Sequence, residues 1–116
     1  MLKRLLLIAG LGLSLAVACE SSLEALPLEI SVTASRSTAA PGDTISFLAT
    51  IQGGSLLGLD VTYGDSTTDQ YGTAGARTGK VTFHHAYKTR GTFTTTITVT
   101  DANAGQKNAS VQVRVE

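Results

Sequence analysis

The sequence has no tryptophan, one cysteine and two prolines among its 116 residues. A single cysteine excludes an intramolecular disulfide. So little proline excludes a proline-rich disordered chain, and the length leaves room for one domain. What holds this small domain together must therefore be its apolar core and its hydrogen bonds.

The sequence also has no excess of charge of one sign. The chain carries nine basic and nine acidic side chains, and removal of the first 18 residues would take Lys3 and Arg4 with it, leaving 9 − 2 = 7 basic against 9 acidic. The formal charge of that mature part is −2, and no cluster of Lys and Arg remains that could neutralise a run of phosphates. We therefore expect no nucleic-acid partner.

Residues 1–18 have the pattern of a signal peptide. Lys3 and Arg4 give a basic start, and the apolar run from Leu5 to Ala18 that follows is roughly fourteen residues long, whereas about twenty are needed to span a bilayer. Small residues at Ala16 and Ala18 are typical of a cleavage site. The sequence thus predicts export.

The position of Cys19 explains an unpaired thiol in an exported protein. The stretch "LAVAC" closes the apolar run and resembles the lipobox of bacterial lipoproteins, which implies lipidation of Cys19 and a membrane partner through that lipid. Each buried methylene contributes about 0.8 kcal/mol, so two or three acyl chains would give stable anchoring. Glu20 is not the aspartate that holds many lipoproteins at the inner membrane, which favours the outer membrane.

A second interpretation of the same residues stays open. The stretch "AVA" before Cys19 also satisfies the A-x-A rule of ordinary signal peptidase, and Ala16 stands where leucine is usual in a lipobox. Cleavage there would release a soluble secreted protein. In either case Cys19 and the polar residues 20–27 form a short tether, which reaches at most about 29 Å.

From residue 28 to residue 116 the pattern is that of strands, with apolar residues at every second position and turns between them. Expected strands cover 28–34, 44–51, 57–63, 80–87, 92–100 and 109–116. We expect Gly53–Gly54 to break the chain, 64–79 to be a connection with one short edge strand near Tyr71, and 101–105 to be a hairpin turn. This predicts an all-β, immunoglobulin-like antiparallel sandwich of two sheets and about seven strands.

Two stretches resemble the signature of PKD (polycystic kidney disease) domains. "VTYGDS" at 61–66 is similar to W-x-F-G-D-G, and "HAYKTRGTFTTTITVTD" at 85–101 is similar to H-x-Y-x-x-x-G-x-Y-x-V-x-L-x-V-x-D. The structural motif residues that carry the resemblance are Tyr63, Gly64, Asp65, His85, Tyr87, Gly91, Phe93 and Asp101. Departures are Val61 for the tryptophan, Ser66 for the second glycine and Thr95 for an apolar residue, which together imply a lighter core.

The adjacent histidines are the first candidates for chemistry. Neighbouring residues of a strand point to opposite faces, so His84 and His85 cannot chelate one metal together, and we interpret His85 as a structural residue on the inward face. Tyr87 resembles the tyrosine corner of immunoglobulin-like folds. We expect a positive φ at Gly91 and an Asx turn at Asp65, and we expect the outward threonines of 94–100 to face solvent.

Catalytic and metal sites have little support. No G-x-S-x-G or H-E-x-x-H occurs, so we expect no enzyme, no catalytic residues and no cofactor. Because some PKD domains bind calcium, Asp60, Asp65, Asp69 or Asp101 could be ligands, but no spacing such as D-x-D-x-D is present, and we expect no metal. The prediction is a monomeric envelope lipoprotein that contacts protein or polysaccharide; the alternatives are a soluble secreted module or a structural spacer without a ligand.

Overall fold

A computed structural model describes residues 26–116; the expected signal peptide and Cys19 lie outside that range. Six strands make up the described chain: β1 (Glu29–Ala34), β2 (Thr38–Ala39), β3 (Thr44–Thr62), β4 (Thr68–Ala86), β5 (Gly91–Asp101) and β6 (Gly105–Val115). This part of the chain contains no helix, and hence none long and apolar enough to cross a membrane. The expected all-β class is confirmed.

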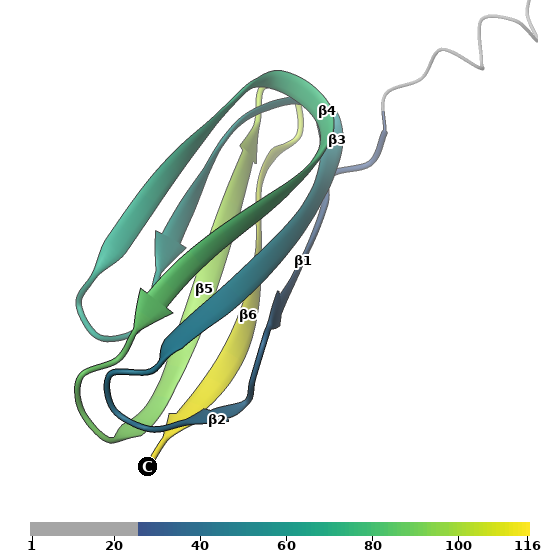
Figure 1. The fold of residues 1–116 in the computed structure, drawn as a ribbon. Helices are drawn as coiled ribbons and strands as arrows, with labels where there is room; N and C mark the ends of the chain where they lie inside the picture. Colours follow the sequence, from purple (N-terminus) through teal and green to yellow (C-terminus); the bar gives the residue numbers. More distant parts are fainter. Residues whose placement is uncertain (1–25) are drawn as a thin grey trace, which may run out of the picture.

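The six strands form one sheet that folds over into two layers, because β3 and β4 are long enough to run through both (Figure 1). In the first layer, the start of β3 pairs with β1 and with the end of β4. In the second, the end of β3 pairs with the start of β4 and with β5, which continues to β6 and β2. All pairs are antiparallel except the short β2–β6 pair. The predicted two-layer sandwich is confirmed, with six strands where about seven are expected because two strands serve both layers.

The glycine pair Gly53–Gly54 does not break the chain, and the expected separate strands at 44–51 and 57–63 are one strand. The β3–β4 register shifts between Gln52 and Leu56 and again between Leu56 and Gly58. Such irregularities bend a strand and increase its twist without ending it. The two glycines therefore lie at the bend where β3 passes from one layer to the other.

The expected connection at 64–79 is also wrong for most of its length, since β4 begins at Thr68. The first half of β4 has β3 as its strand neighbour, and most of its side chains are exposed on both faces. A strand held mainly by backbone hydrogen bonds at a sheet edge has no need of alternating apolar residues. The alternation of apolar residues in the sequence therefore gives no signal for this half of β4.

The core lies between the layers and follows the expected alternation. Ile45, Phe47, Ala49 and Ile51 of β3 are buried, as are Ile97 and Val99 of β5. Val61, at the position of the family's tryptophan, is completely buried. The space is filled by aromatic rings in contact with one another, a set that includes every Phe and Tyr of the sequence: Phe47, Tyr63, Tyr71, Phe83, Tyr87 and Phe93.

The described chain begins and ends at opposite ends of the sandwich (Figure 1). The amide nitrogen of Gln52 donates to the carbonyl of Pro27 at 3.2 Å, so the entry into β1 lies beside the bend of β3. The C-terminus lies at the far end, where Glu116 N–H bonds to the carbonyl of Ala39. The turns that follow Thr62 and Ala86 are also at this far end.

Gly64, in the expected family motif, is confined by its neighbours. Its φ is +84°, and a Cβ would lie 2.7 Å from the carbonyl oxygen of Thr94. Gly42 has a similar φ of +89°, but a Cβ there would meet no atom within 4 Å. A comparison of substitutions at these two glycines therefore separates the cost of backbone strain from the cost of steric overlap.

We expect Gly42→Ala to lower the free energy of unfolding by about 1–3 kcal/mol, through strain alone. Gly64→Ala should lower it by about 1–3 kcal/mol more, because the backbone of β5 must move to admit the methyl group. Urea denaturation of the two variants measures the difference. Equal losses would contradict the close approach of Gly64 to β5.

Candidate functional site

His85 and Asp65 form a pair at the far end of the sandwich. Nε2 of His85 lies 2.7 Å from a carboxylate oxygen of Asp65, and their side chains are only 16% and 20% exposed. The His85 ring stacks on Tyr63 at 3.9 Å between centroids and meets Tyr87 edge-on at 4.7 Å. β4 supplies the histidine and the turn after β3 supplies the aspartate, so the pair joins two segments.

Asp65 also closes its own turn. It accepts hydrogen bonds from the backbone N–H of Thr67 at 3.2 Å and from the Thr67 hydroxyl, as expected of an Asx turn. Partial burial opposes ionisation of this carboxyl, but the hydrogen bonds from Thr67 and His85 outweigh it and hold the pKa of Asp65 below its ordinary value. The carboxylate is therefore the stable form beside His85.

Tyr87 is buried, and its hydroxyl joins the turn after β3 to strand β5. It donates to the carbonyl of Tyr63 at 2.8 Å and lies 2.7 Å from the Thr95 hydroxyl. Because the phenol has one proton, the Thr95 hydroxyl is the donor in the second bond. Thr95 is completely buried, and this bond explains a polar residue where an apolar one is usual. As in a tyrosine corner, the Tyr87 hydroxyl binds a backbone carbonyl. That carbonyl belongs to Tyr63, which is 24 residues upstream.

Phe93 and Gly91 complete the surroundings of Tyr87. Phe93 stacks on the Tyr87 ring at 4.4 Å with an interplanar angle of 11°. Gly91 has a φ of +147° and begins β5. Burial, opposed by the bond from Thr95, raises the pKa of Tyr87, so the phenol keeps the proton that the Tyr63 carbonyl needs.

Tyr63 donates its own hydroxyl to Asp69 at 2.6 Å. Burial, followed by the hydrogen bond and charge of Asp69, raises the pKa of Tyr63 far above its ordinary value. The bond fastens the start of β4 to the turn that follows β3. It does not provide an ionised phenol for chemistry.

His84 lies on the opposite side of the strand from His85. It is exposed, and its Nδ1 lies 2.9 Å from the hydroxyl of Ser46 on the neighbouring strand β3. The two histidines thus contact different partners on different faces of one layer.

The Asp65–His85–Thr67 arrangement is not a nucleophilic relay. In such a relay the hydroxyl and the carboxylate bind different nitrogens of the imidazole. Here the Thr67 hydroxyl, at 3.4 Å, and Asp65 both face Nε2 of His85, and Thr67 is hydrogen-bonded to Asp65 itself. The arrangement can hold two segments together, but it cannot pass a proton from Thr67 through the ring to Asp65.

Asp101 has a separate structural position at the other end of the sandwich, where it ends β5. It is 3% exposed and accepts backbone N–H bonds from Ser55 at 2.7 Å and from Asn103 and Ala104 at 2.9 Å. The bond from Ser55, followed by those from Ala104 and Asn103, lowers the pKa of Asp101. This carboxylate holds the β5–β6 hairpin against the bend of β3.

The four aspartates considered for calcium do not assemble. Asp65 faces His85, Asp69 faces Tyr63, and Asp101 is occupied by backbone N–H groups. Asp60 is exposed in the second half of β3. Among residues 26–116 no three His, Cys, Asp or Glu side chains approach closely enough to hold a metal ion.

Several of these contacts have no signal in the sequence. Tyr63–Asp69 and Tyr87–Thr95 join residues on different strands or turns, so spacing does not reveal them. The Ser55–Asp101 bond spans 46 positions. Only the bonds from Asn103 and Ala104 to Asp101 are local, and an aspartate at the start of a hairpin turn could have indicated them.

The fold and this arrangement of motif residues define an immunoglobulin-like β-sandwich module. A family model described as the PKD domain matches residues 29–115, and the chain therefore belongs to the PKD domain family, as the resemblance indicated. None of the curated proteins compared with the chain matches it.

Solved structures with the same fold include two PKD domains. The PKD domain of a peptidase from a Thermoplasmatales archaeon is 18% identical, with a TM-score of 0.68 over 79% of this chain and 98% of that one. The PKD domain of the human VPS10 domain-containing receptor SorCS2 is also 18% identical, with a TM-score of 0.55 over 78% and 73%. The CARDB domain of a Pyrococcus furiosus protein in complex with di-metal ions is 13% identical, with a TM-score of 0.58 over 77% and 92%. Likeness at these identities shows the fold alone.

We expect His85→Ala to lower the free energy of unfolding by about 2–3 kcal/mol, because it removes a bond to a charged carboxylate and a stacked ring from a largely buried position. His84→Ala, at an exposed site on the same strand, should change it by no more than about 0.5 kcal/mol. Thermal denaturation of both variants tests this. Equal, small effects would contradict the structural role of His85.

We also expect stability to fall in acid. Both Asp65 and Asp101 have folded pKa values below their ordinary value, so their contribution is complete above about pH 4 and is lost as the pH falls through the lowered folded values. Asp101→Asn should therefore be less stable at pH 7 and lose less stability between pH 7 and acid than the natural chain does. Melting temperatures across this range measure the slope, and Glu29→Gln, at an exposed carboxylate, is the matched control. An unchanged acid slope in Asp101→Asn would refute the assignment.

Proposed function

We propose that this chain is an exported envelope lipoprotein, anchored by lipid on Cys19, whose PKD domain contacts protein or polysaccharide at the outer membrane. PKD domains are typically contact modules for protein or carbohydrate, and the chain belongs to that family over residues 29–115. The family match begins at residue 29, ten residues after Cys19, so the module would lie next to the proposed anchor. This order of segments carries the proposal.

The geometry of the domain supports a defined orientation on the membrane. Pro27 lies beside the bend of β3, and the turns of the Asp65–His85 pair lie at the opposite end. With a tether no longer than about 29 Å, the bend would lie near the membrane and the pair would lie farther from it. The two exposed sheet faces would then be open to neighbours in the envelope.

A non-catalytic role is part of the proposal. The hydroxyl and the carboxylate at His85 share one ring nitrogen, and the pKa of Tyr63 is raised, which keeps the phenol protonated. Each group is used to hold neighbouring segments. These features favour a binding module over an enzyme.

We expect Cys19→Ser to move the protein from the membrane fraction to the soluble fraction, because serine cannot form the thioether to lipid. Cell fractionation with immunoblotting measures the change, and mass spectrometry of the N-terminal peptide of the natural protein should show added acyl mass. Ser21→Ala, two positions along, is the matched control and should stay with the membrane. A natural protein without acyl mass would favour the soluble secreted module.

Capture from an envelope extract tests the contact role separately. The lipid-anchored chain should retain protein or polysaccharide beyond what denatured protein retains. If anchoring is present but nothing is retained in repeated captures, the domain is a spacer and the contact role is wrong.

A further inference from the structure

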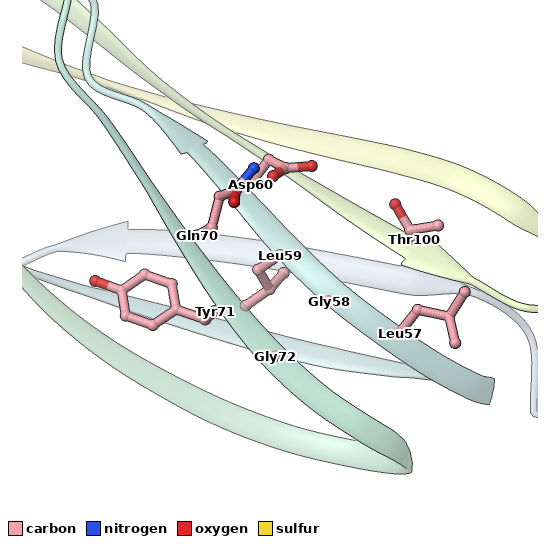
Figure 2. A pocket seen from close by; sticks show the side chains of 8 residues that line it. All are labelled: Leu57, Gly58, Leu59, Asp60, Gln70, Tyr71, Gly72 and Thr100. Atoms are coloured by element: carbon pink, nitrogen blue, oxygen red, sulfur yellow. The ribbon is translucent and has the colours of Figure 1, made fainter.

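A hollow of about 400 Å³ lies where β3, β4 and β5 run side by side in the second layer (Figure 2). Its volume is in the range of small-molecule sites, about 300–1,000 Å³. We call it the glycine groove, formed by Leu57, Gly58, Asp60, Gln70, Gly72 and Thr100. Leu59 and Tyr71, from the intervening positions, also line it, while their side chains belong to the core or pack against it.

The floor of the groove is bare backbone, because Gly58 and Gly72 are paired across the β3–β4 ladder. The structure itself explains Gly58: a Cβ there would lie 3.0 Å from the carbonyl oxygen of Tyr71. Gly72 has no such reason. A Cβ at Gly72 would meet no atom within 4 Å, and its φ is not positive.

Glycine in the middle of a strand is unfavourable by roughly 0.5–1 kcal/mol relative to alanine. A strand glycine that neither φ nor packing requires can mark a bulge or the close approach of a ligand or another backbone, and the register shift between Leu56 and Gly58 lies directly beside the Gly58–Gly72 pair. Within the described residues no atom lies within 4 Å of a Cβ placed on Gly72. The bare floor therefore leaves room for a ligand that lies flat against it.

Polar groups stand beside this floor without partners of their own. Asp60 and Gln70 are paired across the same ladder and are both exposed, and Figure 2 shows their polar ends together above the strands. Within residues 26–116 neither side chain takes part in a hydrogen bond or an ion pair. On the other side, Leu57 is 54% exposed and offers an apolar edge.

The sheet face that continues from the groove is polar and carries one charge. Reading across the ladders, Asp60 continues to Thr98 and Asn108, Gly58 to Thr100 and Gln106, and Thr62 to Thr96 and Ser110. Asp60 is the single charge in these three rows. A face of hydroxyls and amides suits a neutral partner rich in hydroxyls and gives nothing to a polyanion.

A peptide strand fits this face less well. The backbone N–H and C=O groups of β3 point to its ladder neighbours on both sides, so a peptide lying on the groove floor could not add to the sheet. Strand addition, which is how extended peptides usually bind β-domains, would use the free edge of β4 beside the floor instead. The apolar anchors that protein interfaces need are also few. Carbohydrate is the class that the groove fits.

We propose that the glycine groove binds a neutral polysaccharide chain. A sugar ring lies flat on the backbone of Gly58 and Gly72 with its C–H edge on Leu57. Its hydroxyls donate to the Asp60 carboxylate, and the Gln70 amide both donates and accepts. This inference rests on the proposed contact function and names its partner class and its site.

Gly72→Val tests the groove without disturbing the fold, because the new side chain enters open space and valine favours strands. Thr94→Val is the matched control on the same sheet face, outside the groove. The probes are cellohexaose, maltohexaose and hexa-N-acetylchitohexaose at up to about 10 mM, with an oligogalacturonate of equal length as the anionic comparison. Nitrogen-15 NMR of the full-length chain in detergent reports binding residue by residue.

We expect at least one neutral hexasaccharide to shift the amide signals of Gly58, Asp60, Gln70 and Gly72, and the oligogalacturonate to shift none of them. Gly72→Val should weaken binding at least about tenfold, equivalent to about 1.4 kcal/mol, and Asp60→Ala should weaken it in the same direction. Thr94→Val should bind as the natural chain does. The melting temperature of Gly72→Val should equal or exceed that of the natural chain.

Three results would overturn the inference: no shift with any neutral probe, shifts confined to other residues, or equal binding by Gly72→Val. The proposed function can survive each of them. Capture of an envelope protein would leave the contact module intact, and polysaccharide retained equally by Gly72→Val would place the contact on another surface. Fractionation of Cys19→Ser is independent of all these outcomes.

Discussion

The buried hydroxyl of Tyr87 must keep its hydrogen bonds, and the far end of the sandwich is arranged around that need. An unpaired phenol in a core would cost about 1–3 kcal/mol. Its proton goes to the carbonyl of Tyr63 and its oxygen accepts from Thr95, so β5 and the turns after β3 and β4 meet at one atom. A threonine in place of an apolar residue at 95 is a consequence of this bond. His85 and Phe93 then cover the Tyr87 ring on two sides.

The same arrangement compensates for the missing tryptophan. Val61 cannot fill the space of an indole, and aromatic rings from three strands (β3, β4 and β5) and from the turns after β3 and β4 meet between the layers instead. His85 takes part as a flat ring against Tyr63 while its Nε2 reaches Asp65. An imidazole can do both because its faces pack and its edge binds. This explains why a histidine sits at the border between the core and the surface here.

The sequence predicts those strands whose two faces differ. Phe47 and Ile97 lie in segments with one buried and one exposed face, and period two reveals them. The first half of β4 has mostly exposed side chains on both faces and is held through its backbone, so nothing in 64–79 announces a strand. Gly53 and Gly54 lead to a wrong prediction of a strand end. Glycine is common both at a bend within a strand and at a break between strands, so the sequence does not distinguish the two. The sequence pattern assigns each motif residue to a segment. It does not reveal a pair such as Asp65 and His85, because that contact forms only when the turn after β3 meets the end of β4 in space. The groove has no signal in the sequence, because only the pairing of β3 with β4 brings Gly58 and Gly72 together.

That β3 and β4 pass through both layers has a consequence for cooperativity. Two layers joined only by loops can loosen one at a time, whereas here the backbone ladder itself continues from one layer into the other across the bend at Gly53. Because the same two strands belong to both layers, we expect the layers to open together and not one at a time. The surfaces of the two layers, the glycine groove included, should then keep their positions relative to each other. In the proposed lipid-anchored protein, a change of angle between the module and the membrane would have to arise outside this ladder, which begins at Glu29.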